Sequence, residues 1–269
     1  MKPELTLGQA LRQGASFLAR AGVEAPQLTA EVLLAHALGR PRVYLHAHRE
    51  EPLTELAWIH YGRWLAERAG GKPTQYITRK QEFWGREFYV APGALIPRPE
   101  TEHVIERALA IGPPAIGAIV DVGTGSGCIA VILSTIWRRP VIAIDRSAAA
   151  LEVARRNTAG TLVELVQGDL LTAIRNAGLI VTNPPYLPSA EALPPEVAQW
   201  EPPEALYGGP DGLDVWRAII ATTPPGAWLV GEIDSRAEIG PLFATGWEHY
   251  TVTPDLAGRP RVVSACRAV

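Results

Sequence analysis

The chain has 269 residues, of which 47% are hydrophobic and 20% charged, a balance that is typical of a folded globular protein and excludes a disordered or fibrous chain. Its 25 basic and 28 acidic side chains give a net charge of −3, which argues against a protein that coats a nucleic-acid backbone. Two cysteines are too few for a disulfide scaffold, and the six histidines lack metal-ligand spacing, so we expect no bound metal.

The first residues lack the long apolar run of a signal peptide, and the chain has no stretch of about 18 apolar residues. We therefore expect a cytoplasmic protein that does not enter a membrane.

Three segments near the N-terminus, residues 5–22, 27–39 and 54–71, carry apolar residues at helical spacing. Thr29 is the expected N-cap of the second helix, and Gly39 its expected end. No strand pattern interrupts these segments, so they predict a small helical bundle as a first domain of residues 1–71.

The composition changes after residue 71, where aromatic and β-branched residues are broken by Gly and Pro. Short strands at 82–84 and 87–90 predict a β-hairpin about Gly85, within a connector of residues 72–98. Pro99 suits the first turn of a helix that runs to Ala110. That helix opens a third region, residues 99–269.

Strand and helix patterns alternate from residue 118 to the C-terminus. We expect strands at 118–122, 141–145, 162–169, 179–182 and 228–234, and helices at 128–137, 147–160 and 237–246. Two β segments around Gly258 end the chain. The alternation predicts an α/β fold with a doubly wound, mostly parallel sheet that a C-terminal antiparallel hairpin closes.

A glycine-rich loop separates the strand at 118–122 from the helix at 128–137. Glycines let the chain turn tightly and let a ligand approach the backbone. Asp145 ends the next strand, about 20 residues further on, where an acid can hold the ribose hydroxyls of a nucleoside. Because the carboxyl ends of parallel strands share one edge of the sheet, we expect a nucleoside site there. The alternative is a tight structural turn.

The glycines follow the spacing GxGxG, which differs from the GxGxxG of dinucleotide enzymes, and no Lys follows as in a P-loop. The loop resembles motif I of class I methyltransferases that use S-adenosyl-L-methionine. The resemblance implies that Asp145 holds the ribose and that Asp169 and Leu170 contact the adenine. It also implies that the methionine part faces the acid and the loop, namely Asp121, Gly123, Thr124, Gly125, Ser126 and Gly127.

Asn183-Pro184-Pro185-Tyr186 follows the strand at 179–182. Two prolines cannot continue a central strand and force the chain into a rigid bend. The Asn183 side-chain oxygen and the Pro184 carbonyl could each accept one N–H of a planar amino group and turn its lone pair toward a sulfonium methyl. Tyr186 would pack on the face of that group. The alternative is a rigid strand exit with a capping Asn.

This corner resembles the (D/N/S)PPY motif of methyltransferases that modify amide or exocyclic amine nitrogens. The resemblance implies that Asn183, Pro184 and Tyr186 act in catalysis, that Pro185 also contacts the substrate, and that Asn183 also touches the cofactor.

Nearly the whole chain resembles the HemK/PrmC family of N5-glutamine methyltransferases, which act on peptide chain release factors. Besides the loop and the corner, the resemblance is carried by Leu95-Ile96-Pro97-Arg98-Pro99-Glu100-Thr101-Glu102, Glu201-Pro202 and Gly208-Gly209-x-Asp211-Gly212. It implies a Rossmann-like fold with a seven-stranded sheet and transfer of a methyl group to the glutamine of a Gly-Gly-Gln loop. It also implies that the N-terminal helical domain, residues 1–71, is a substrate-recognition domain. The cofactor would leave as S-adenosyl-L-homocysteine.

Three alternatives remain open at this point. An adenine-N6 or guanine-N2 methyltransferase of nucleic acids would share the loop and the corner, but base flipping calls for a cationic surface. A non-catalytic nucleoside-binding module would need only the loop. A dinucleotide oxidoreductase would leave the corner unexplained. We expect a monomer that binds release factors and does not bind nucleic acid directly.

Overall fold

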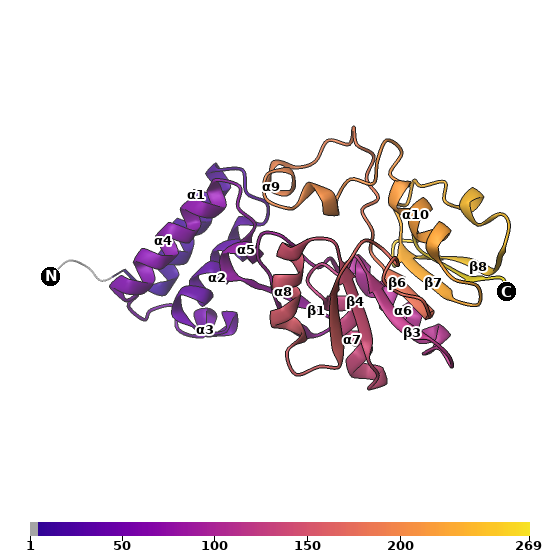
Figure 1. The fold of residues 1–269 in the computed structure, drawn as a ribbon. Helices are drawn as coiled ribbons and strands as arrows, with labels where there is room; N and C mark the ends of the chain where they lie inside the picture. The colour runs from indigo at the N-terminus through magenta and orange to yellow at the C-terminus, as the bar shows by residue number, and fades with distance from the viewer. Residues whose placement is uncertain (1–4) are drawn as a thin grey trace. The chain divides into compact units, whose positions relative to one another are not determined.

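The computed structural model describes residues 5–269, and the chain packs as two compact units (Figure 1). The first unit contains the residues up to Arg79 together with Pro194–Trp200, and the second contains Lys80–Leu193 and Glu201–Val269. Residues 1–4, the start of the predicted first domain, lie outside the described residues. The domain boundaries drawn from the sequence, after residues 71 and 98, stay predictions.

The first unit is helical. Its helices are α1 (Leu7–Arg20), α2 (Pro26–Leu38), α3 (Arg42–Ala47), α4 (Glu55–Ala69), α5 (Thr74–Thr78) and α9 (Pro195–Ala198). The three helices predicted from apolar spacing are confirmed as α1, α2 and α4. The sequence analysis missed α3, α5 and α9, whose six or fewer residues are too short to show a helical period.

The ends of these helices show how well local signals can be read. Thr54 caps α4 by accepting a hydrogen bond from the Ala57 N–H at 3.3 Å. Gly39 ends α2 in the left-handed conformation, as predicted. Thr29 as the N-cap of α2 is wrong, because α2 already begins at Pro26, a residue that suits the first helical position.

Tyr61 of α4 is fully buried at the centre of the first unit, among apolar side chains of α1 and α2. Tyr61 packs closely against Gly14 of α1, and a Cβ atom on Gly14 would collide with the Tyr61 hydroxyl. The two helices can therefore approach this closely only with glycine at position 14.

The second unit begins with a β-hairpin of β1 (Lys80–Phe83) and β2 (Arg86–Tyr89), which confirms the turn predicted about Gly85. Trp84 and Gly85 both have positive φ, 54° and 66°, as a tight two-residue hairpin turn requires. The predicted helix after the connector begins with a single turn, η1 (Pro99–Thr101), and continues as α6 (Glu102–Ile111).

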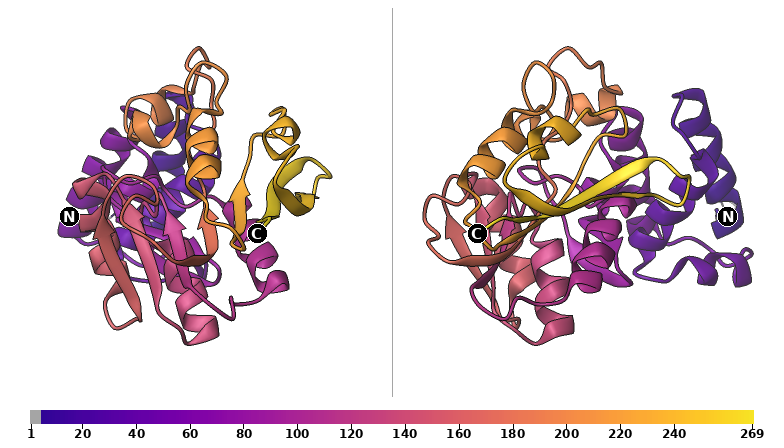
Figure 2. Two further views of the ribbon diagram at one scale, coloured as in Figure 1. Left: turned by 45° about the vertical axis from the view of Figure 1, so that its right-hand side comes forward. Right: turned by 90° about the vertical axis from the view of Figure 1, so that its right-hand side faces the viewer.

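Within residues 5–269 the main sheet has seven strands in the order β5-β4-β3-β6-β7-β9-β8 (Figures 1 and 2). The first five run parallel, and β8 and β9 form an antiparallel hairpin, coloured yellow in Figure 2, at one edge. The predicted fold class is thus confirmed. The strands are β3 (Ala118–Val122), β4 (Val141–Asp145), β5 (Val163–Gln167), β6 (Ala177–Thr182), β7 (Trp228–Glu232), β8 (Trp247–Pro254) and β9 (Pro260–Arg267).

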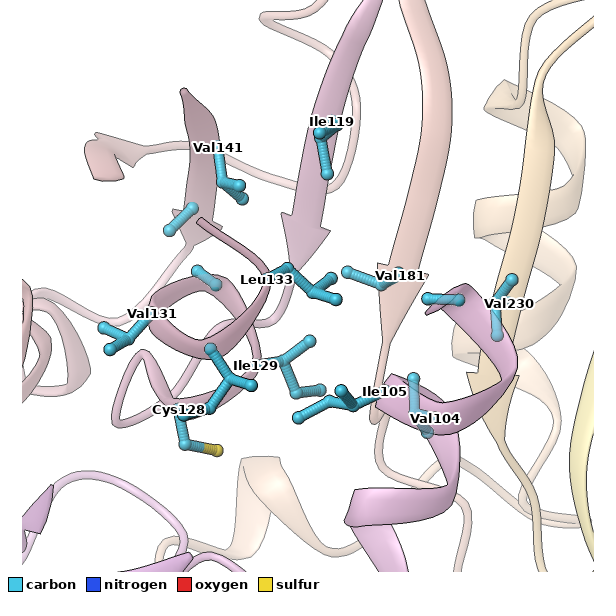
Figure 3. Close-up of a cluster of buried hydrophobic side chains, with 14 of the residues drawn as sticks. Val104, Ile105, Ile119, Cys128, Ile129, Val131, Leu133, Val141, Val181 and Val230 are labelled. Atoms are coloured by element: carbon cyan, nitrogen blue, oxygen red, sulfur yellow. The ribbon is translucent and has the colours of Figure 1, made fainter. Parts of the chain in front are cut away.

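Helices cover both faces of this sheet and bury its apolar side chains. On one face, α6 and α7 (Cys128–Trp137) enclose the cluster drawn in Figure 3. On the other face, α10 (Asp214–Thr222) places Trp216 and Ile219 against the strands. Burial on both sides explains why strands such as β6 are apolar without alternation.

Three further elements complete the second unit: α8 (Ala148–Thr158), η2 (Pro203–Ala205) and η3 (Gly240–Phe243). Helix α8 confirms its prediction, whereas the helix predicted over residues 237–246 is wrong. Only the short turn η3 forms there, since Gly240-Pro241 interrupts the pattern. No helix in the described part of the chain is long and apolar enough to cross a membrane.

The sheet order brings the two motifs of interest together. Strands β3 and β6 are neighbours, with Val122 paired to Thr182 at their carboxyl ends. The glycine loop after β3 and the proline corner after β6 therefore leave the same edge of the sheet, where open α/β sheets bind ligands.

Candidate active site

The glycine loop joins β3 to α7 through three glycines in the left-handed region. Their φ angles are 68° at Gly123, 57° at Gly125 and 82° at Gly127. A Cβ atom on Gly123 would meet nothing within 4 Å, and one on Gly125 would meet only a carbonyl oxygen at 4.0 Å. Glycine is needed here for its backbone freedom, and the space above the loop is open.

Asp145, at the end of β4, ties this loop to its neighbour. Its Oδ2 atom accepts a hydrogen bond from the Gly125 N–H at 2.9 Å, and its Oδ1 atom accepts one from the Ser147 N–H at 2.8 Å. The carboxylate thus orders both loops, and each of its oxygens keeps a further lone pair for a ligand.

Asp121 lies fully buried near the end of β3. Its Oδ2 atom accepts hydrogen bonds from the Thr124 hydroxyl at 2.6 Å and from the Ala130 N–H at 3.1 Å, in the first turn of α7. Its Oδ1 atom is buried with no hydrogen-bond partner among the described residues. Burial raises the pKa of Asp121 to about 7, against the two hydrogen bonds, which lower it.

The proline corner is held by hydrogen bonds from two of its side chains. Asn183 donates from Nδ2 to the Thr101 hydroxyl at 2.9 Å. The Tyr186 hydroxyl donates to Oε1 of Glu232, at the end of β7, at 2.9 Å. Burial, followed by the nearby charge of Glu232, raises the pKa of Tyr186, so its hydroxyl stays protonated.

A glycine-rich segment, residues 206–212, braces the same corner. The Leu187 N–H donates to the Leu206 carbonyl at 3.0 Å, and the Gly208 N–H donates back to the Leu187 carbonyl at 2.9 Å. A Cβ atom on Gly208 would collide with the Pro185 carbonyl oxygen, and one on Gly212 with the Tyr186 carbonyl oxygen. Glycine is required here for close backbone approach, which gives a physical reason for the Gly208-Gly209-x-Asp211-Gly212 signature.

One cavity of about 440 Å³ in the second unit joins the glycine loop to the corner. Such a volume suits a small-molecule ligand. The predicted site residues that line it are Gly123, Thr124, Gly125, Ser126, Asp145, Asp169, Leu170, Asn183, Pro184 and Pro185. Those that lie outside its lining are Asp121, Gly127 and Tyr186.

The rest of the lining was not predicted from the sequence to belong to the site. It includes Thr101 and most residues of the segments 93–97, 202–209 and 214–219. Glu201 fixes the first of these segments, since its Oε2 atom accepts the Ile96 N–H at 3.0 Å and its Oε1 atom pairs with Arg98. Part of the signal was present, because Thr101 and Glu201-Pro202 stand in the family signature, but their place at the cavity follows only from the fold.

A parallel sheet with a GxGxG loop, an acid on the next strand and an Asn-Pro-Pro-Tyr corner at one cavity defines a class I methyltransferase. Two family models match the chain: the PrmC N-terminal domain over residues 9–78 and the methyltransferase small domain over residues 107–198.

Curated relatives match over almost the full length. The release factor glutamine methyltransferase of Koribacter versatilis is 41% identical and covers 96% of this chain and 98% of its own. That of Moorella thermoacetica is 42% identical, with 98% and 99% covered. The chain therefore belongs to the release factor glutamine methyltransferase family.

Solved structures agree on the fold. The hMettl16 catalytic domain in complex with a MAT2A 3′UTR hairpin superposes with a TM-score of 0.54 at 18% identity, covering 76% of this chain and 81% of that one. The 16S rRNA methyltransferase RsmC of T. thermophilus, in complex with AdoMet and guanosine, gives 0.52 at 17% identity, covering 70% and 49%. At these identities the likeness concerns the fold alone.

Proposed function

We propose that this protein transfers a methyl group from S-adenosyl-L-methionine to the side-chain amide nitrogen, N5, of the glutamine in the Gly-Gly-Gln motif of peptide chain release factors. The observation that carries the proposal is one cavity whose lining contains the glycine loop and Asp145 together with Asn183, Pro184 and Pro185. The names of the curated relatives support the choice of substrate.

The cofactor side of the cavity fits S-adenosyl-L-methionine. The open space above Gly123 and Gly125 admits a ligand against the loop backbone, and Asp145 keeps lone pairs that can accept ribose hydroxyls. We assign Asp169 and Leu170 to the adenine. Asp121 and Gly127 were predicted to face the methionine part, but both lie outside the cavity lining, and we assign them to support of the loop. When bound, the cofactor supplies an activated methyl group, and S-adenosyl-L-homocysteine is its product.

The corner would make the amide nitrogen reactive by orienting it. A carboxamide nitrogen is a weak nucleophile because its lone pair is delocalised. The Asn183 side-chain oxygen and the Pro184 carbonyl would each accept a hydrogen bond from one N–H of this nitrogen. These two bonds would turn the lone pair toward the methyl group and stabilise the charge that develops on nitrogen. A neutral Asn183 also avoids burying a charge beside a neutral substrate. The hydroxyl of Tyr186 is already engaged in a hydrogen bond to Glu232, so Tyr186 would act on the substrate through packing of its ring.

The direct test uses purified protein, isotopically labelled S-adenosyl-L-methionine and a release factor, with the methylated residue identified by mass spectrometry. We expect one methyl group on the glutamine of the Gly-Gly-Gln motif, and none on a release factor in which that glutamine is replaced. Transfer RNA, ribosomal RNA and duplex DNA are offered in parallel. Label in nucleic acid alone would favour the adenine-N6 or guanine-N2 alternative.

A monomeric state, a cytoplasmic location and the absence of direct nucleic-acid binding belong to the same proposal. The net charge of −3 and a protein substrate support the last of these. Size-exclusion chromatography with light scattering and a salt-dependent RNA-binding assay test the first and last points.

A further inference from the structure

A chain of hydrogen bonds links the corner to two buried residues, Thr101 and Glu232, that were not among the predicted site residues. Asn183 donates from Nδ2 to Oγ1 of Thr101 at 2.9 Å, and the same Thr101 hydroxyl donates to Oε2 of Glu232 at 2.7 Å. Tyr186 donates to the other oxygen of Glu232 at 2.9 Å. Thr101 ends η1 and Glu232 ends β7, so this relay joins the corner to two other elements of the second unit.

Because Glu232 accepts from both the Thr101 and the Tyr186 hydroxyls, the direction of the remaining hydrogen bond, between Thr101 and Asn183, is fixed. A threonine hydroxyl has one proton, and here that proton goes to Glu232. Its oxygen can then only accept from Asn183, so the amide nitrogen of Asn183 must face Thr101. Thr101 and Glu232 are 2% and 1% exposed, so the hydrogen bond between them is shielded from water.

The remaining polar atom of Asn183 is Oδ1. Among the described residues this oxygen has no hydrogen-bond partner, and it is not one of the buried unpartnered atoms. Asn183 itself lines the cavity. The oxygen is therefore accessible from the cavity. If the amide were rotated by half a turn, an N–H donor would stand at the position where the proposed function needs an acceptor.

We propose that Thr101 and Glu232 are positioning residues that hold the Asn183 amide with its oxygen presented to the substrate, Glu232 by taking the proton of Thr101 and Thr101 by accepting from Nδ2. This inference rests on the proposed function for its catalytic consequence. The orientation of the amide itself can be measured without any substrate.

The first measurement is a nuclear magnetic resonance spectrum of the ¹⁵N-labelled full-length protein, with the Asn183 side-chain NH₂ signals assigned by their loss in Asn183→Ala. Thr101→Val should shift these signals, and Thr101→Ser should restore them. Thr223→Val is the matched control, since it removes a buried threonine hydroxyl that donates to the Ile219 carbonyl at 2.8 Å. Signals that are unmoved in Thr101→Val would overturn the inference, whatever the substrate proves to be.

The second measurement is methyl transfer to the release factor. Thr101→Val should lower kcat on the order of tenfold, the cost of one lost hydrogen bond, while the Kd of the cofactor changes little. Thr101→Ser should recover native kcat, and Thr223→Val should keep it. If Thr101→Val fails to fold, Thr101→Ala replaces it in both measurements, because it removes the hydroxyl without adding a methyl group beside Glu232.

A double-mutant cycle decides whether Thr101 acts through Asn183. In the Asn183→Ala background, Thr101→Val should change kcat less than about twofold, because the amide that it positions is already gone. Equal losses in both backgrounds would mean that Thr101 acts independently and would overturn the inference. Native protein that fails to methylate the release factor would instead overturn the proposed function and leave the spectroscopic result standing.

Discussion

The glycine loop and the proline corner leave neighbouring strands, yet they are held in place in different ways. The loop is shaped by backbone conformation, with left-handed glycines and open space above Gly123 and Gly125. The corner is clamped by the buried Thr101–Glu232 relay and by a glycine segment that fits against its carbonyls. The two regions therefore differ in what they provide: the loop leaves room for a ligand, and the corner fixes the orientation of the Asn183 amide.

The sharpest test of this contrast compares glycine substitutions in the two regions. Gly212→Ala should destabilise the protein by about 5 kcal/mol or more, because the new Cβ atom collides with the Tyr186 carbonyl and φ is 80°. Gly125→Ala should cost only about 1 kcal/mol, from backbone strain alone. Denaturant unfolding measures both.

Gly160→Ala is the matched control for strain, since Gly160 has φ of 75° and open space around its Cβ position. If Gly212→Ala were as stable as Gly160→Ala, the corner would have moved to accommodate the new Cβ atom. That result would contradict a rigidly held corner.

The buried carboxylate near the loop makes a second prediction, on pH. Because the pKa of Asp121 is about 7 in the folded protein and about 3.9 in an unfolded chain, the folded state binds more protons between these values. The free energy of unfolding should therefore fall, by about 4 kcal/mol from this group, as the pH rises from about 4 to about 7.

Asp121→Asn keeps an acceptor for Thr124 and Ala130 but cannot ionise, so its stability should lack this contribution. The measurement is the difference between the native and Asp121→Asn unfolding free energies across the pH range. A difference that does not change with pH would contradict the assignment.

A third prediction concerns the corner itself. Asn183→Ala should lower turnover on the order of a hundredfold or more, because a positioned acceptor beside developing charge is lost. The affinity for the cofactor should fall much less. Asn176→Ala, at an exposed position of the second unit, is the control and should keep native turnover. Equal losses of turnover and affinity would mean that Asn183 serves binding instead.

The smallest expected effect is on cofactor binding. Asp145→Ala should weaken the binding of S-adenosyl-L-homocysteine on the order of tenfold or more, as expected when hydrogen bonds to a carboxylate are lost. Isothermal titration calorimetry gives the Kd. Asp145→Asn, which keeps one acceptor oxygen for the Gly125 N–H, should lose less. An unchanged Kd in Asp145→Ala would show that Asp145 does not hold the ribose.

Local signals in the sequence predicted most of the fold and both motifs. Strand and helix patterns are local properties, and so are the loop and the corner, whose residues are contiguous in the chain. The relay could not be predicted in this way, because Asn183 and Thr101 are 82 positions apart and Thr101 and Glu232 are 131 apart. Only the sheet order, which places β6 beside β7, brings such residues together.

The failures have local causes of their own. Thr29 has the right chemistry for a cap, but Pro26 begins the helix earlier. Residues 237–246 have apolar spacing, but Gly240-Pro241 prevents a full helix.

The assignment of Pro194–Trp200 to the first unit has a consequence for biosynthesis. Arg68, 8% exposed, forms an ion pair with Glu196, which the ribosome adds 128 residues later. Until residues 194–200 have been made, the first unit lacks the segment that carries this carboxylate, so the ion pair of Arg68 cannot form. The helical unit should therefore mature late in translation, after more than two thirds of the polypeptide has been made.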